Sequence, residues 1–208
     1  MDNLYGKNKD YISYSSYTLW KQNKDAYRRK YYDGGESISS PELVFGKKIA
    51  RLLEDKELDH IEKYKVMEQK IMVEIDGVKV LSYLDSYQPY KFLEYKTGVV
   101  SWTKTRVQKH LQLDWYSLMI QKWKGKVQDQ CKLIWIETTK EKINYHGHKI
   151  EGGIRLTGKV EVFKRSVKQW ERDLLEKEII KTAHEIRRDY KETLQRHGKE
   201  VTEATSKK

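Results

Sequence analysis

The chain of 208 residues contains one cysteine, two prolines and twelve glycines. A single cysteine, Cys131, allows no internal disulfide and no cysteine-held zinc or iron–sulfur site, and we interpret it as a small buried thiol. So few prolines and glycines exclude collagen-like and proline-rich linker architectures. No apolar run approaches the roughly 20 residues that cross a bilayer, and the first residues lack the apolar core of a secretory signal. We therefore expect a cytoplasmic protein that does not bind a membrane.

Motifs that bind phosphates or carry nucleophiles are also missing. The sequence contains no G-x-x-x-x-G-K-[ST] loop, no G-x-G-x-x-G turn and no G-x-S-x-G elbow. Their absence argues against P-loop ATPases, Rossmann dehydrogenases and serine hydrolases. His146 and His148 stand in a glycine-containing turn with no further ligand near them in the sequence, so we interpret them as an exposed loop and not as a metal site.

Positive charge, by contrast, is abundant. Lysine and arginine number 42 against 31 acidic residues, which gives a formal net charge of +11. Such a surplus favours a polyanionic partner, most often nucleic acid. Residues 18–32 contain Arg28, Arg29 and Lys30 among four aromatic residues. This composition is suited to binding phosphates through the cations and bases through the rings. The alternative is an amphipathic helix with its aromatic side chains in the core. This alternative explains the aromatic residues at least as well as nucleic-acid binding does, but it explains the charges of residues 28–30 less well.

Hydrophobic periodicity and turn signals predict an α/β protein. Ser40 and Pro41 are typical of a helix start, and Asp76-Gly77 between alternating apolar residues is typical of a β-hairpin. Thr105 and Ser166 each precede a glutamine by three residues, as in a capping box. We expect one domain over residues 1–195, with a mixed sheet flanked by helices, and a polar, flexible tail over residues 196–208. The expected elements are helix 15–32, helix 40–55, strands 71–75, 78–84 and 90–95, helix 105–122, strands 131–139 and 153–165, and a final helix after residue 166.

The chemically distinctive residues are Asp85, Glu94 and Lys96. In a strand, residues 94 and 96 face the same side, and Asp85, at the end of the preceding strand, can lie beside Glu94. Two close carboxylates repel each other unless a cation lies between them, and oxygen ligands suit Mg²⁺ or Mn²⁺. A lysine beside that ion can orient or deprotonate a water molecule and offset the charge of an attacked phosphate. The set therefore fits metal-dependent hydrolysis of phosphodiesters.

The spacing alone is a weak signal, because Asp59 and Glu68-Gln69-Lys70 repeat it. Asp59 lies in a charged segment without a strand pattern, whereas Asp85 and Glu94 are flanked by apolar residues that favour strands. A site needs rigid supports, so we predict the site at Asp85 and Glu94.

The segment LSYLDSYQPYKFLEYKTG, followed by QLDWYSLMI, resembles the PD-(D/E)XK nuclease superfamily in its RecB-like and phage exonuclease branch. The resemblance extends over about residues 11–120: SYSSYTLWKQNKDAYRRKYY resembles the N-terminal helix of the branch, and FGKKIARLLE resembles its G-x-x-x-H/E helix. It implies a restriction-endonuclease-like fold and a Mg²⁺-dependent deoxyribonuclease, an exonuclease of DNA recombination, repair or processing.

The resemblance also implies roles for single residues. Asp85 and Glu94 would hold Mg²⁺, or Mn²⁺ in its place, with the backbone carbonyl of Tyr95 as a further ligand. Lys96 would position the attacking water, and Gln112 would steady the site or the DNA backbone. The expected nucleic-acid contacts are Gln112, Tyr116, Arg28, Arg29 and Lys30.

Two positions depart from the pattern of the family. Where members usually supply a histidine or glutamate ligand, this chain has Ala50, and where a glycine precedes the aspartate it has Ser82. The first departure leaves the number of bound metal ions open. Glu54, one helical turn after Ala50, is the substitute ligand that we consider, although an exposed acid at the end of a helix is the more ordinary interpretation. Iron–sulfur cysteines, found in some relatives, are absent.

The main rival function is a non-catalytic nucleic-acid-binding protein that keeps the nuclease fold without the ligand of its first helix. The presence of Asp85, Glu94 and Lys96 together favours the enzyme. DNA is the expected partner, and a recombination or single-strand-annealing protein and a second copy of the chain are the further partners considered. The sequence leaves open the choice between exonuclease and endonuclease, the cleavage polarity and the preference for DNA over RNA.

Overall fold

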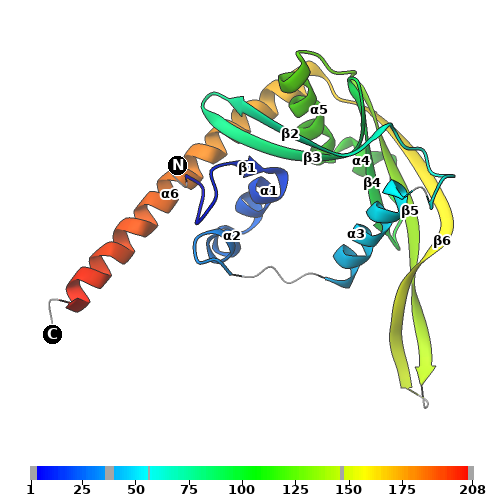
Figure 1. The fold of residues 1–208 in the computed structure, drawn as a ribbon, viewed down its shortest axis with the longest axis horizontal. Helices are drawn as coiled ribbons and strands as arrows, with labels where there is room; N and C mark the ends of the chain where they lie inside the picture. The colour runs from blue at the N-terminus through cyan, green and yellow to red at the C-terminus, as the bar shows by residue number, and fades with distance from the viewer. Residues whose placement is uncertain (1–3, 36–39, 56, 146–147, 206–208) are drawn as a thin grey trace. The chain divides into compact units, whose positions relative to one another are not determined.

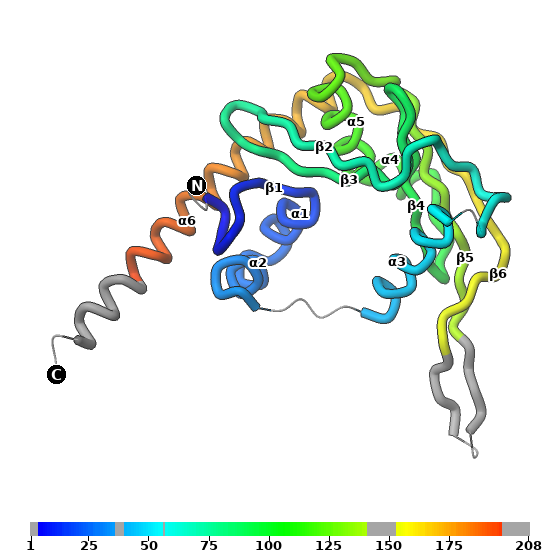
Figure 2. The backbone as a smooth tube through the Cα atoms, in the orientation of Figure 1, coloured from blue at the N-terminus to red at the C-terminus, as the bar shows by residue number. Residues whose placement is uncertain are grey.

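The computed structural model describes the backbone over residues 4–35, 40–55, 57–145 and 148–205, and the side chains over these ranges except 141–152 and 197–205 (Figure 2). The chain divides into two compact units. The first unit comprises residues 1–37, 72–82 and 173–208, and the second comprises residues 38–71 and 83–172. Each unit is therefore built from separate stretches of the chain, and a single domain over residues 1–195 stays a prediction.

The strands form a mixed six-stranded sheet in the order β1-β3-β4-β5-β6, with β2 also paired to β3 (Figure 1). β1 pairs with β3 in parallel, β3 with β4 antiparallel, β4 with β5 in parallel, and β5 with β6 antiparallel. Together with its flanking helices, this sheet confirms the predicted α/β class. The strands are β1 (Ile12–Ser13), β2 (Val66–Ile75), β3 (Val78–Gln88), β4 (Lys91–Gly98), β5 (Gln130–Tyr145) and β6 (His148–Ser166).

The predicted hairpin between β2 and β3 is confirmed. Asp76 and Gly77 have φ values of 49° and 71°, the positive pair that a two-residue type I′ turn requires. A second two-residue loop, Pro89-Tyr90, joins β3 to β4, and the register there pairs Ser86 with Leu93. Both hairpins keep strands that are close in sequence next to each other in the sheet.

The N-terminal helical segment was predicted as one helix and consists of two, α1 (Tyr14–Gln22) and α2 (Lys24–Tyr31). Asn23 separates them with an extended backbone, φ −156°, and its side chain accepts a hydrogen bond from the Ala26 N–H. Asparagine is a good cap because its side chain replaces a missing backbone partner. The cap of α1 is Ser13 and not Ser15 or Ser16.

The helix α3 (Pro41–Glu54) begins as predicted, with Ser40 accepting from the Leu43 N–H and Pro41 in the first turn. Only part of its expected apolar face is buried. Leu43 and Val44 are exposed, whereas the later part of the helix covers a core of the second unit. That core consists of Ile49, Leu53, Ile61, Leu93, Ile134 and Ile136. The charge-dense, poorly periodic sequence of residues 54–65 predicts a connector. Residues 55 and 57–65 indeed have no regular structure, whereas Glu54 still belongs to α3.

The two predicted capping boxes are wrong. Thr103 and not Thr105 caps the short helix α4 (Lys104–Gln108), and α5 (Leu111–Lys124) follows it after a break without a side-chain cap. Ser166 is the last residue of β6, and α6 (Gln169–Thr205) begins later, where the Lys168 N–H donates to the Glu171 carboxylate at 2.7 Å. A capping pattern predicts a helix start only within a few residues.

The stripe that the sequence predicts to face inward from the final helix is confirmed only in part. It consists of Val167, Trp170, Leu174, Ile179, Ala183 and Ile186, of which Trp170 and Leu174 are 65% and 57% exposed. The buried positions recur at helical spacing from Leu175 onward, through Ile179, Ala183, Ile186 and Tyr190. The helix continues to Thr205, into the segment expected to be a tail, whose flexibility stays a prediction. Over the residues that the structure covers, no helix is both long and apolar enough to span a membrane.

Candidate active site

A pocket of about 320 Å³ lies in the second unit, between α3, the edge of β2 and the strands β3 and β4. It contains the three residues that the sequence pointed to, Asp85, Glu94 and Lys96, together with Gln112 of α5. These residues therefore line one pocket, and their catalytic and metal-binding roles stay predictions. Its complete lining is Glu42, Leu43, Gly46, Lys47, Ile49, Ala50, Leu53, Met67, Glu68, Asp85, Glu94, Tyr95, Lys96, Thr97 and Gln112.

The β3–β4 hairpin brings the two carboxylates together. Its register pairs Ser86 with Leu93, so that Asp85 follows opposite Glu94. Oδ2 of Asp85 accepts a hydrogen bond from the Tyr95 N–H at 2.9 Å, which fixes the carboxylate at this edge of the strand. Rigid strands therefore hold both acids, as the apolar flanks predicted.

Burial and mutual repulsion raise the pKa of Asp85 well above its usual range, and the Tyr95 N–H and the Lys96 ammonium oppose this rise. Glu94 is 1% exposed, and its Oε1 forms an ion pair with Lys96. The other oxygen, Oε2, is buried without any hydrogen-bond partner among the described residues. A buried charged oxygen without a partner is costly, and Glu94 lines a pocket that already contains a second acid.

Lys96 is held in place by a chain of hydrogen bonds through Gln112 and Tyr116. Its Nζ donates to Oε1 of Gln112 at 2.8 Å, and Nε2 of Gln112 donates to the Tyr116 hydroxyl at 2.7 Å. Tyr116 is 5% exposed and packs edge-on against Phe92, with ring centroids 5.6 Å apart. Burial first, and then the nearby acids, raise the pKa of Tyr116. The chain Lys96–Gln112–Tyr116 therefore orients the lysine, and the expected contacts of Gln112 and Tyr116 with nucleic acid stay predictions.

The donor set fits a hard divalent cation. Carboxylate oxygens are the ligands of Mg²⁺, which keeps several waters and needs only one or two carboxylates beside its substrate phosphates. The unpartnered Oε2 of Glu94 and the close approach of Asp85 are both features that such an ion would satisfy. As the side chains stand, no cluster of three or more His, Cys, Asp or Glu able to hold a metal occurs in the described part of the chain. The Tyr95 carbonyl as a ligand and the number of ions stay predictions.

The first-helix position lacks a ligand, as the sequence showed. Ala50 and Gly46 of α3 line the pocket, and a Cβ on Gly46 would stand 3.6 Å from Oγ1 of Thr97, so the helix lies close to β4. Glu54, the substitute considered, is exposed and does not line the pocket. Two acids outside the expected set do line it, Glu42 of α3 and Glu68 of β2, and Glu68 was not chosen because it belonged to the rejected Asp59 pattern.

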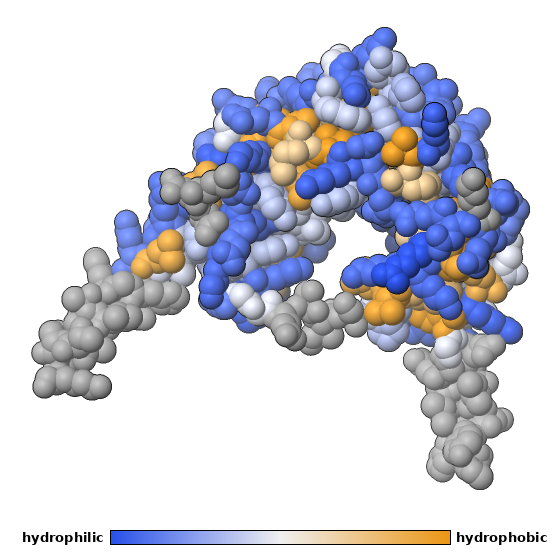
Figure 3. Space-filling model, viewed as in Figure 1, coloured by the Kyte–Doolittle hydropathy of each residue, from blue (hydrophilic) through white to orange (hydrophobic). Residues whose placement is uncertain are grey.

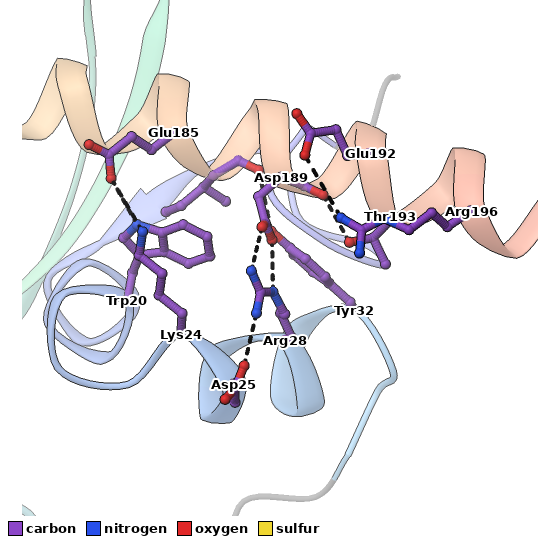
Figure 4. A network of polar contacts seen from close by, with 11 residues as sticks. Trp20, Lys24, Asp25, Arg28, Tyr32, Glu185, Asp189, Glu192, Thr193 and Arg196 are labelled. Carbon is purple, nitrogen blue, oxygen red and sulfur yellow. Dashed lines mark hydrogen bonds and ion pairs between the residues drawn. The ribbon is translucent and has the colours of Figure 1, made fainter.

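Residues 28–30 belong to the first unit and are not equivalent to one another. The Arg28 guanidinium donates from Nε to Asp189 at 3.0 Å and from Nη1 to Asp25 at 2.8 Å (Figure 4). Arg29 is exposed, and the Lys30 ammonium lies 5.3 Å from the centroid of the neighbouring Tyr31 ring. Arg28 therefore has a structural partner on α6, whereas Arg29 is the cation of the three with an exposed side chain.

The aromatic side chains interleaved with these cations are mostly core residues. Trp20, Tyr27 and Tyr32 are 1%, 0% and 8% exposed, and their rings contact one another and Tyr190 of α6. This is the amphipathic-helix alternative that the sequence left open. Rings buried in this way cannot stack on bases.

The remaining candidates do not form a site. Cys131 is buried and donates to the Arg165 carbonyl at 3.5 Å, and burial raises its pKa to about 12, as expected of a structural thiol. Asp59 is exposed in a turn and pairs with Lys63 at 2.8 Å. His146 and the His148 side chain lie outside the described residues.

No family model matches the chain, and no curated protein matches it. Several solved structures are similar to the structure of this chain. A protein of Eubacterium rectale described as "putative exonuclease" is 13% identical, with 88% of this chain and 83% of that one covered at a TM-score of 0.57. A phage-related exonuclease from Haemophilus somnus 129PT is 10% identical, with 86% and 84% covered at a TM-score of 0.52. At such identities the likeness establishes the fold, which this chain shares with these exonuclease structures.

Proposed function

We propose that the chain is a metal-dependent deoxyribonuclease of the PD-(D/E)XK type, in its RecB-like and phage exonuclease branch. The observation that carries this proposal is the convergence of Asp85, Glu94 and Lys96 in one pocket, with a buried Glu94 oxygen that has no partner among the described residues. The shared fold with exonuclease structures supports it. The order of the matched motifs along the sequence supports it independently of the fold.

A bound Mg²⁺ or Mn²⁺ would polarise the scissile phosphate and lower the pKa of a bound water. Asp85 and Glu94 would hold the ion, and their rigid strands would fix its position. Lys96, kept in place by Gln112, would donate hydrogen bonds to the attacking water and offset the negative charge that develops on the phosphate. Gln112 and Tyr116 would preserve this orientation without touching the reacting atoms.

Surface charge beside the pocket fits a phosphodiester backbone as substrate. Lys47, Lys48 and Arg51 of α3 are exposed and have no ion pair among the described residues, and Lys47 lines the pocket. Figure 3 shows strongly hydrophilic surface next to apolar surface over α3, where Leu43 and Val44 are exposed. Lysine and arginine at the mouth of an acidic site would bring a polyanion to acids that would otherwise repel it.

A cleavage assay on end-labelled linear DNA and on closed circular DNA, with Mg²⁺, with Mn²⁺ and with EDTA, tests the proposal. We expect metal-dependent loss of the linear substrate, and an exonuclease would leave the closed circle intact. Glu57→Gln, an exposed acid of the connector, is the control, and Asp85→Asn is the inactive comparison. No cleavage of either DNA with either metal would overturn the proposed enzyme.

The absence of a three-ligand cluster among the described residues, with Ala50 on α3, favours one second candidate, a nucleic-acid-binding protein without activity. The same assay separates the two functions, because such a protein would bind DNA at low salt and cut none of it.

A further inference from the structure

The pocket contains an acid that the family pattern does not supply, Glu68 near the start of β2. It lines the same pocket as Asp85 and Glu94. The remaining acid of the lining, Glu42, is paired with Lys140 at 3.0 Å. In the described part of the chain the Glu68 carboxylate has no hydrogen bond and no ion pair, so nothing in the described protein competes for it.

The backbone directs Glu68 into the pocket in a way that a regular strand does not. Successive residues of a strand point to opposite faces, yet Met67 and Glu68 both line the pocket. Glu68 has φ +50°, the left-handed region that a residue with a side chain rarely adopts. Strain of this kind persists where the surrounding structure enforces it, and it clusters at functional sites.

The electrostatic surroundings of Glu68 would favour a cation. Burial first, and then the charges of Asp85 and Glu54, raise the pKa of Glu68. Across the pocket, Oε2 of Glu94 is buried and unpartnered among the described residues, which independently indicates a missing positively charged ligand. Besides the paired Glu42, three acids line the pocket against two lysines, Lys47 and Lys96, and the α3 residue at the ligand position of the family is the uncharged Ala50.

We propose that Glu68 is the third carboxylate of the metal site and replaces the ligand that α3 lacks at Ala50. This inference rests on the proposed nuclease function. Glu68 lines the pocket and is only partly covered by its neighbours, which is enough to raise its pKa and still leaves its side chain free to turn towards an ion held by Asp85 and Glu94. Glu54, which is exposed outside the pocket, would then influence the site only through its charge.

Metal titration without DNA tests the inference, because it does not depend on cleavage. Calorimetry with Mn²⁺ and with Mg²⁺ compares the parent protein with Glu68→Gln, Glu54→Gln and Glu57→Gln. We expect Glu68→Gln to weaken binding by about tenfold or more, as loss of a ligand does. Glu54→Gln and the exposed control Glu57→Gln should stay within about twofold of the parent.

A second variant separates the ligand from the fold. Glu68→Gly removes the carboxylate and also relieves the positive φ, because glycine adopts that region freely. It should therefore weaken metal binding while it raises the melting temperature of the metal-free protein. If Glu68→Gly bound metal more weakly because it misfolds, its metal affinity and its melting temperature would both be lower than those of the parent.

The outcomes distinguish the inference from the function that it rests on. If the parent binds metal and Glu68→Gln binds it equally well, Glu68 is not a ligand, whereas the nuclease proposal survives. If Glu54→Gln is the variant that weakens binding, Glu54 is the third acid and the inference is wrong. If the parent binds neither metal, the proposed function fails, and the inference fails with it.

Discussion

At the scale of single residues, the buried charge of Glu94 is neutralised by one ion pair, with Lys96. Glu94 is 1% exposed, and Lys96, whose side chain is 29% exposed, provides its counter-charge. Removing one partner of a buried pair leaves a charge that water cannot reach. The same lysine would therefore serve the metal-free fold as well as the reaction.

Lys96→Ala should abolish most of the cleavage and also destabilise the metal-free protein. Loss of a group that acts on the reacting water lowers rates by about 10²- to 10⁴-fold. The partial exposure of Lys96 limits the stability cost to about 1–2 kcal/mol. Added Mn²⁺ should restore the melting temperature, because the ion replaces the missing counter-charge.

Cleavage of end-labelled DNA and thermal unfolding with and without Mn²⁺ measure both effects. Lys70→Ala is the matched control, since Lys70 ends the second copy of the same sequence pattern and is exposed. If Lys96→Ala cleaves as fast as the parent, the site has been placed wrongly.

The residues of the site differ in how far the sequence could reveal them. Asp85, Glu94 and Lys96 were predictable, because apolar neighbours on both sides marked the strands that hold them. Glu68 was not, because its position depends on a left-handed backbone at φ +50°, which no alternation of residues encodes. Sequence patterns predict regular structure and therefore miss a residue whose role depends on an irregularity.

His110 is a half-buried histidine that resists protonation. Its ring packs at 4.7 Å from that of Trp102, and its Nε2 has no hydrogen-bond partner among the described residues. Burial first, and then the charges of Lys96, Arg106 and Arg165, lower its pKa to about 4. The folded protein therefore binds fewer protons at this residue than the unfolded chain does between about pH 6.5 and pH 4.

Acid should consequently destabilise the protein through His110. Where the unfolded state binds more protons, stability falls as the pH falls, so the loss should occur from about pH 6.5 towards pH 4. A shift of this size corresponds to at most about 3 kcal/mol, and the partial exposure of His110 reduces that figure. Urea unfolding between pH 7 and pH 4 should show a flatter pH dependence for His110→Phe than for His60→Phe, an exposed histidine. Equal slopes for the two variants would contradict the assignment.

At the scale of elements, the N-terminal helices show what local pattern cannot predict. The charge of residues 28–30 looked uniform in sequence, yet Arg28 donates to Asp189, a residue 161 positions away on α6. The break at Asn23, the cap at Thr103 and the later start of α6 at Gln169 were missed because a helix start is specified by one or two hydrogen bonds. The prediction of a hairpin at Asp76-Gly77 was confirmed, because its tight turn needs residues that tolerate positive φ and the sequence shows such a pair.

Substitutions of the three cations of α2 should therefore have different effects on stability and on DNA binding. Arg28→Ala should lower thermal stability, because it leaves Asp189 partly buried without its partner, and should leave the salt dependence of DNA binding unchanged. The double variant Arg29→Ala/Lys30→Ala should retain stability and flatten the log–log salt dependence by up to about two units, about one for each phosphate that the protein no longer neutralises. An unchanged slope for the double variant would mean that these two residues form an ordinary solvated face.

At the scale of the whole molecule, the element order and the mixed sheet were largely predictable, because each strand and helix carries its own periodicity. The division into two units was not, since each unit combines stretches far apart in the chain. The parallel pairing of β1 with β3 was also beyond the sequence, because β1 has only two residues. Long-range pairings depend on the packed whole and not on any local run of residues.

The net charge of +11 predicts that DNA binding is strongly salt-dependent, and the structure indicates where much of that dependence arises. Lys47, Lys48 and Arg51 form an exposed, unpaired group of cations on α3, within the described residues, and Lys47 reaches the pocket. Replacing all three by alanine should weaken duplex binding and lower the log–log salt slope by about two to three units. Metal affinity should not change, because none of the three is an acid of the site.

Fluorescence anisotropy in EDTA, over a series of salt concentrations, measures that slope without cleavage. The matched control replaces Lys122, Lys124 and Lys126 by alanine, three exposed lysines at the end of α5 and just after it, which removes the same charge. If α3 contacts the backbone directly, its variant shows a greater decrease in slope than the control does. If both variants show the same decrease, the dependence comes from the net charge of the molecule, and α3 is not the path by which a strand reaches Asp85 and Glu94.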